Sequence, residues 1–126
     1  MKAHFILYVS DQDRSTAFYS AVLSMEPTLN VPGMKEFSVG GAVLGLMPED
    51  GIKRLLGTSI EHPERANGIP RAEVYLIVDD PEAFHQRSIA AGGRELSPLE
   101  LRNWGHIAAY SQDPDGHILA FASEKA

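Results

Sequence analysis

Residues 4–9 read His-Phe-Ile-Leu-Tyr-Val, and residues 73–78 read Glu-Val-Tyr-Leu-Ile-Val. Each stretch is a short run of apolar, β-branched and aromatic residues, which is typical of a buried strand. A residue able to bind a metal, His4 or Glu73, begins each run, and an acidic helix-start signal and a segment with Ala-Phe follow. The runs begin 69 residues apart (positions 4 and 73). We therefore interpret them as the leading strands of an internal repeat, with His4 and Glu73 at matching places around one cavity.

The first repeat continues with signals for one helix and three strands. Ser10 or Asp11 can cap a helix, and Pro27 ends it. Gly40-Gly41 predicts a hairpin turn, because glycine reaches positive φ without steric cost. The apolar residues at helical spacing are Ala17, Phe18, Ala21, Val22 and Met25. The strands are expected near 28–31, 35–39 and 42–47.

The second repeat follows the same plan. Asp80 is a good N-cap, and Pro81 suits the first helical position, where its missing amide is harmless. The helix is expected to reach about Ala91 and to stop at Gly92-Gly93. Asp113-Pro114-Asp115-Gly116 is a strong turn sequence. The strands are expected near 94–96, 106–112 and 117–122.

These patterns predict an α+β fold of two βαβββ modules. The modules are expected at 1–47 and 72–126, joined by a long loop at 48–71 with a short helical piece around 52–56. We expect the two sheets to curl into one mixed sheet, shaped as a cup with the helices outside. The whole chain of 126 residues would then be a single domain.

Composition excludes several classes of function. The chain has no cysteine, which excludes disulfides, thiolate metal sites and cysteine nucleophiles. Its net charge is −6, and it has no basic cluster longer than Lys53-Arg54, so neither nucleic acid nor an anionic membrane is an expected partner. The apolar stretch 5–9 is too short for a signal peptide or a membrane span. We expect a cytoplasmic protein.

Several motifs make the sequence similar to the vicinal oxygen chelate superfamily, which includes glyoxalases, bleomycin resistance proteins and extradiol dioxygenases. The motifs are Tyr8-Val9-Ser10-Asp11, Ala17-Phe18-Tyr19, Val22-Leu23, Trp104-Gly105, Tyr110 and the run Asp113-Pro114-Asp115-Gly116-His117-Ile118-Leu119-Ala120-Phe121. The resemblance covers nearly the whole chain and implies a small organic ligand held in the cup. It does not select a reaction, because the superfamily hosts unrelated chemistries on one scaffold.

The resemblance also implies four positions for metal ligands. His4 and Glu73 occupy the two leading-strand positions, whereas Gly45 and Ala120 occupy the two last-strand positions and have no donor atom. Two protein ligands plus water bind a divalent ion weakly, since at least three usually come from protein. We therefore expect no cofactor. The alternative is a divalent metal (Zn, Ni, Mn or Fe) held by His4 and Glu73.

Strand alternation places further candidates on the inner face of the cup. His4, Ile6 and Tyr8 share one face of their strand, and the other face, with Phe5, Leu7 and Val9, should pack on helices. Glu73, Tyr75 and Ile77 share a face in the second half. At the start of a strand facing a partly apolar cavity, Glu73 is also a candidate general base. The plainer alternatives are a His4–Glu73 ion pair or two solvated side chains.

The region after residue 101 adds aromatic and polar candidates. Trp104, the only tryptophan, offers a flat wall for an organic ligand, unless it only plugs the mouth of the cup. Tyr110 should face the cup, and Arg102 and His106 are expected at its rim. We expect His117 to be structural and His62 and His85 to lie on the surface. The predicted ligand-binding residues are His4, Ile6, Tyr8, Glu73, Tyr75, Trp104, His106, Tyr110 and Ala120.

Two functions follow from these residues. The first is a metal-free protein that binds a small aromatic or cationic molecule, supported by Gly45 and Ala120. The second is a metal-dependent lyase, isomerase or dioxygenase that uses His4 and Glu73, with Glu73 as ligand or base. In either case we expect a homodimer, because short two-module chains of the class that this sequence resembles commonly exchange halves.

Overall fold

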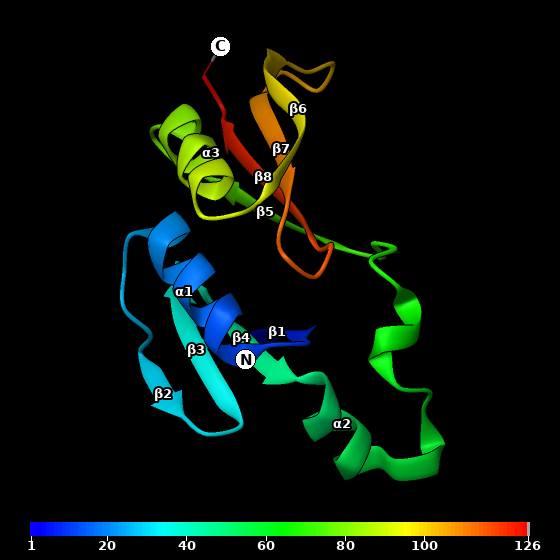
Figure 1. The fold of residues 1–126 in the computed structure, drawn as a ribbon. Helices are drawn as coiled ribbons and strands as arrows, with labels where there is room; N and C mark the ends of the chain where they lie inside the picture. Colours follow the sequence, from blue (N-terminus) through cyan, green and yellow to red (C-terminus); the bar gives the residue numbers. More distant parts are fainter. Residues whose placement is uncertain (126) are drawn as a thin grey trace. The chain divides into compact units, whose positions relative to one another are not determined.

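The computed structural model describes residues 1–125, and over these residues the chain forms eight strands and three α-helices (Figure 1). It divides into two compact units, the first made of Met1–Ser20 and Ser24–Asn67, the second of Ala21–Leu23 and the chain from Gly68 onward. The elements up to the joining segment are β1 (Ala3–Val9), α1 (Gln12–Leu23), β2 (Leu29–Val31), β3 (Met34–Val39), β4 (Ala42–Pro48) and α2 (Glu49–Leu56). The later ones are β5 (Glu73–Ile77), α3 (Pro81–Ala90), β6 (Arg94–Leu101), β7 (Ile107–Gln112) and β8 (Ile118–Ser123).

The two sheets have the same topology, which confirms the α+β repeat expected from the sequence. The first sheet has the strand order β1-β4-β3-β2 and the second β5-β8-β7-β6. In each, the leading strand lies parallel to the last strand, and the other neighbours are antiparallel. Each sheet is open and has not closed into a barrel, so each keeps its leading strand at one edge.

The register of the parallel pairs makes Gly45 and Ala120 equivalent positions. In the first sheet Ile6 lies opposite Gly45, and in the second Tyr75 lies opposite Ala120. Because opposed residues point to the same face of a sheet, each small residue lies beside the large side chain of its leading strand. The sequence alignment of the two halves is therefore correct to the residue at these strands.

The helices begin where their capping residues predict. Asp11 accepts a hydrogen bond from the backbone N–H of Arg14 at 3.0 Å, and Asp80 accepts one from Ala83 at 3.1 Å. Each bond satisfies an amide of the first helical turn that has no partner within the helix. Helix α1 ends at Leu23, two residues before the last predicted apolar position, because Ser24 adopts the left-handed conformation with φ of 55°.

Helix α3 packs on one face of the second sheet (Figure 1). The hydroxyl oxygens of Ser88 and Ser111 lie 2.8 Å apart, and the rings of Phe84 and Phe121 lie 5.6 Å apart. The face of the sheet that carries Ser111 and Phe121 is therefore the helix-covered face. Tyr110 and Ala120 are the chain neighbours of Ser111 and Phe121, so alternation along each strand places them on the opposite face.

The buried residues of the first unit come mainly from strand β4 and helix α1, with Phe37 from β3. Phe37, Leu44 and Leu46 are almost fully buried, and the amide of Gln12 in α1 donates to the backbone oxygen of Leu46 at 2.9 Å. Of the three β1 residues expected to pack on helices, Val9 is buried but Phe5 is 65% exposed. The expectation was wrong for Phe5 because β1 is an edge strand of its sheet, and only one of its flanks is covered by a neighbouring strand.

The turn at 113–116 forms as predicted and explains His117. The Asp113 carboxylate accepts hydrogen bonds from the backbone N–H groups of Asp115 and His117, both at 2.9 Å, and lies 2.7 Å from Nδ1 of His117. Gly116 closes the turn with φ of +97°. His117 is therefore a structural residue, as expected.

The segment that joins the two halves is more regular than a long loop. Helix α2 is longer than the piece expected at 52–56, and two short 3-10 helices follow at Gly57–Ser59 and Pro63–Ala66. The Lys53 ammonium donates to the backbone oxygens of Gly57 and Ile60, both at 2.7 Å, which ties the end of α2 to the chain that follows. None of the helices over residues 1–125 is long and apolar enough to cross a membrane.

Candidate functional site

The face of the second sheet opposite α3 carries most of the residues that the sequence analysis selected in that half. Tyr75 and Tyr110 both lie opposite Ala120, from the strands on either side of β8. Glu73 precedes Tyr75 by two residues and therefore shares its face. Ala120 is fully buried, whereas Glu73 is exposed. We call this arrangement of Glu73, Tyr75, Tyr110 and Ala120 the open face.

A chain of hydrogen bonds joins three of the predicted residues at this face. The indole nitrogen of Trp104 lies 3.0 Å from the Tyr75 hydroxyl, and that hydroxyl lies 2.7 Å from Nδ1 of His106. The rings of Tyr75 and His106 have centroids 5.8 Å apart and planes inclined by 36°. Trp104 is half exposed, at 51%. The structure thus unites residues from a leading strand and from the β6–β7 connection.

The connection that presents Trp104 and His106 is a tight turn. The N–H of Arg102 donates to the backbone oxygen of His106 at 2.8 Å, and the N–H of Gly105 donates to that of Arg102 at 3.0 Å. Gly105 has φ of +96°, a conformation that side chains with a Cβ rarely adopt. These bonds set where the indole and the imidazole lie relative to Tyr75.

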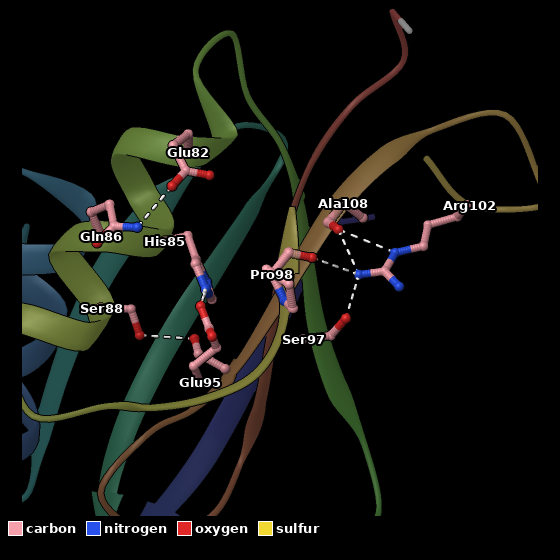
Figure 2. A network of polar contacts seen from close by, with 10 residues as sticks. Glu82, His85, Gln86, Ser88, Glu95, Ser97, Pro98, Arg102 and Ala108 are labelled. Atoms are coloured by element: carbon pink, nitrogen blue, oxygen red, sulfur yellow. Dashed lines mark hydrogen bonds and ion pairs between the residues drawn. The ribbon is translucent and has the colours of Figure 1, made fainter. Parts of the chain in front are cut away.

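Arg102 braces this turn and does not stand free at a rim. Its guanidinium donates to the backbone oxygen of Ala108 through Nε at 3.1 Å and Nη2 at 2.8 Å, to Ser97 Oγ at 2.8 Å and to the backbone oxygen of Pro98 at 3.0 Å (Figure 2). Its Nη1 lies 3.4 Å from the Glu100 carboxylate. The sequence predicted a polar rim residue, but the donors of Arg102 are directed at its own unit.

Tyr110 lies next to Arg102, and its pKa is raised. The guanidinium carbon of Arg102 lies 5.1 Å from the centre of its ring, a cation–π contact. Burial raises the pKa of Tyr110, the negative charge of Glu73 raises this pKa further, and Arg102 opposes the rise. Among residues 1–125 no hydrogen bond engages the Tyr110 hydroxyl, so it is available as a donor.

The first unit contains a His–Glu pair, of which the sequence predicted His4 as a site residue but not Glu36. Nδ1 of His4 lies 3.6 Å from the carboxylate of Glu36, which is on β3 directly opposite Gly45. Ile6 and Tyr8, on the same face as His4, are 41% and 38% exposed. The signal for Glu36 was present, because a two-residue turn at Gly40-Gly41 pairs 39 with 42 and hence 36 with 45.

His85 was expected on the surface, and that expectation was wrong. The residue is 1% exposed, and its Nε2 lies 2.8 Å from the carboxylate of Glu95 on β6 (Figure 2). It lies one turn before Ser88, on the helix face that packs on the sheet, so its position in the helix outweighs its polarity. His62 lies as expected, partly exposed and 2.7 Å from Asp50.

A family model described as the Glyoxalase/Bleomycin resistance protein/Dioxygenase superfamily matches residues 3–121. The chain belongs to this superfamily. It is 30% identical to lactoylglutathione lyase of Haemophilus influenzae over an alignment of 131 positions, which covers 98% of this chain and 92% of the relative.

Solved structures of the superfamily share the fold. A glyoxalase-related enzyme from Fulvimarina pelagi superposes with a TM-score of 0.82 at 24% identity, over 98% of this chain and 87% of that one. A glyoxalase/bleomycin resistance protein/dioxygenase from Nocardioides gives a TM-score of 0.72 at 21% identity, over 98% and 82% of the two chains. At these identities the likeness concerns the fold.

Members of the superfamily often use a divalent metal, and the donors within either unit of this chain do not fit one. Gly45 has no donor, and a Cβ there would meet the Ile6 side chain at 3.2 Å and the Met34 sulfur at 3.3 Å, so a larger residue would require these side chains to shift slightly. Ala120, the equivalent position, likewise has no donor. Over residues 1–125, no three His, Cys, Asp or Glu side chains gather as a metal site. His4 and Glu73 as metal ligands stay a prediction.

Proposed function

We propose that this chain binds a small organic ligand at the open face of the second unit, with Trp104, Tyr75, His106 and Tyr110 as its contacts. The observation that carries this proposal is the hydrogen-bonded chain Trp104–Tyr75–His106 beside Ala120. An aromatic surface with a few fixed polar atoms is the usual make-up of a site for an organic molecule. Ala120 offers no metal ligand, which leaves Glu73 as the one carboxylate among the four residues of the open face.

Other residues selected from the sequence remain predicted contacts. Glu73 adds a negative charge at the start of β5, which favours a cationic ligand group. In the first unit, His4, Ile6 and Tyr8 present an exposed strip of strand β1 and stay predicted ligand contacts. We also propose that the chain acts as a homodimer.

The test is a thermal-shift screen of small aromatic compounds, run with and without Zn, Ni, Mn and Fe ions. A ligand that binds only the native state stabilises it by about 2.7 kcal/mol at roughly 100 times its Kd. We expect at least one compound to raise Tm without added metal, and Trp104→Ala to remove that rise. Leu101→Ala is the matched control, because Leu101 is also an exposed apolar residue beside the turn, at 65%. Stabilisation only in the presence of a metal would contradict the proposal.

The second candidate is a metal-dependent lyase, isomerase or dioxygenase that uses His4 and Glu73. The identity to lactoylglutathione lyase favours it. Elemental analysis of the purified protein separates the two candidates: stoichiometric metal that is lost in His4→Ala and in Glu73→Gln would establish the second. Metal-free protein that no divalent ion stabilises would leave only the first.

A further inference from the structure

The direction of one hydrogen bond at Tyr75 follows from the chemistry of its partner. The indole nitrogen of Trp104 can only donate, so in the 3.0 Å contact the Tyr75 oxygen must be the acceptor. The second contact, 2.7 Å to Nδ1 of His106, is then the one to which the Tyr75 O–H can donate. Accepting from Trp104 leaves the Tyr75 O–H free to point toward the imidazole.

A donated proton from Tyr75 fixes the state of the His106 ring. Nδ1 can accept this bond only if it carries no proton itself, and in a neutral imidazole the proton is then on Nε2. Over residues 1–125, no hydrogen bond engages Nε2 of His106. Nε2 of His106 is not a buried atom, so it is in contact with solvent. His106 thus presents one free N–H donor at the end of the chain of bonds.

Arg102, near the open face, does not supply this donor. The Nε and Nη2 donors of Arg102 are engaged with Ala108, Ser97 and Pro98, and its Nη1 lies 3.4 Å from Glu100. Nε2–H of His106 and the hydroxyl of Tyr110 are thus two free donors near the open face. Both are complementary to an oxygen acceptor, such as a carbonyl oxygen.

We propose that Tyr75, oriented by Trp104, is a positioning residue that holds His106 in its Nε2–H form, so that His106 donates to an oxygen atom of the bound ligand. This inference rests on the proposed ligand site, and it adds the class of ligand atom that the site recognises. A ring free to exchange its two neutral forms would offer an acceptor at Nε2 part of the time and would lose this selectivity.

The test reads the ring nitrogens of the intact, ligand-free protein by long-range ¹H–¹⁵N NMR at about pH 8.5, where an ordinary imidazole is neutral. The signals of His106 among the five histidines are assigned by their loss in His106→Gln. We expect a protonated Nε2 and an unprotonated Nδ1. In Tyr75→Phe the ratio of the Nε2–H to the Nδ1–H form should fall on the order of fivefold, the factor that corresponds to a net hydrogen bond of ~1 kcal/mol.

Trp104 supplies an independent signal, since the single tryptophan gives one indole N–H resonance. Tyr75→Phe removes its acceptor, so this proton should shift and exchange faster with water. The matched control is Tyr110→Phe, which removes a hydroxyl from the same face without touching His106 and should leave the His106 ratio unchanged. A native ring protonated on Nδ1, or an unchanged ratio in folded Tyr75→Phe, overturns the inference. Because no ligand is added, this result stands apart from that of the ligand screen.

Discussion

Among single residues, Tyr110 gives the most direct test of the electrostatics of the open face. Burial and the charge of Glu73 raise its pKa above the usual value of about 10, and Arg102 opposes them. We expect Glu73→Gln to lower the pKa of Tyr110, because the substitution removes one negative charge and keeps the size of the side chain. A site-specific NMR titration of the tyrosine ring carbons measures this pKa. An unchanged value in Glu73→Gln would show that the carboxylate does not act on the phenol.

The same shift makes stability depend on pH in the alkaline range. A phenol whose pKa is raised only in the folded state binds its proton more tightly there than in the unfolded chain. Its contribution to stability is complete below the unfolded pKa of about 10 and is lost as pH rises through the folded pKa. In urea titrations between about pH 9 and pH 11, the free energy of unfolding should therefore fall less with pH in Tyr110→Phe than in the native protein.

His85 and Glu95 give a prediction about stability that does not involve the open face. Nε2 of His85 has Glu95 as its partner, whereas Nδ1 is a buried atom without one over residues 1–125. Glu95→Ala would leave both ring nitrogens without a partner, and we expect it to lower the free energy of unfolding by about 1–3 kcal/mol in urea titrations. Glu95→Gln keeps an acceptor oxygen and should cost less than half as much. Equal losses in the two variants would contradict this account.

The residues that sequence reasoning found and missed differ in what determines their position. Alternation along a strand correctly grouped Tyr75 with Glu73, because side-chain direction in a strand follows from position alone. The bonds from Tyr75 to Trp104 and His106 depend on the path of a turn some 30 residues later, which no local pattern encodes. His85 was misplaced for a related reason: a polar residue is expected outside, unless the fold supplies a partner such as Glu95.

At the scale of elements, turns and caps were the most predictable features. Asp11, Asp80 and Gly116 act as their residue types predict, since each solves a local problem of an unpaired amide or of positive φ. Strand ends were less predictable: β6 runs to Leu101, although its signal ended near 96. Its pairing with β7 has register shifts between Glu95 and Glu100, and such bulges interrupt the alternation from which a strand is predicted.

Gly116 offers a test of close approach between two segments of the second unit. A Cβ at this position would lie 2.6 Å from the backbone oxygen of Gly68 and would also force a side chain into φ of +97°. We expect Gly116→Ala to lower the free energy of unfolding by more than the ~1–3 kcal/mol of backbone strain alone. Gly33→Ala is the matched control, because Gly33 has φ of +88° and open space around its would-be Cβ. Urea unfolding measures both variants. A similar decrease in the free energy of unfolding in the two would show that the Gly68 backbone moves to make room for the Cβ.

For the whole molecule, the shared strand order of the two units leaves two comparable edges. β1 pairs only with β4 within its sheet, and β5 only with β8 within its own. An edge strand presents unpaired backbone groups that readily accept another strand, and natural edges usually carry charges or proline to prevent this. Strand β1 instead carries Phe5, Ile6 and Tyr8, all exposed. Such an edge suits association with a second copy of the chain.

We therefore expect sedimentation velocity to give a mass about twice that of the 13.8 kDa chain. Phe5→Lys places a charge on the β1 edge and should shift the protein toward the monomer, because burying an unpaired ammonium in an interface is costly. Leu55→Lys is the matched control: Leu55 is 70% exposed and belongs to helix α2, not to an edge strand, and its substitution should leave the dimer intact. Circular dichroism checks that both variants fold. A native protein that sediments as a monomer at all concentrations would contradict the dimer, and a folded Phe5→Lys dimer would place its interface elsewhere than β1.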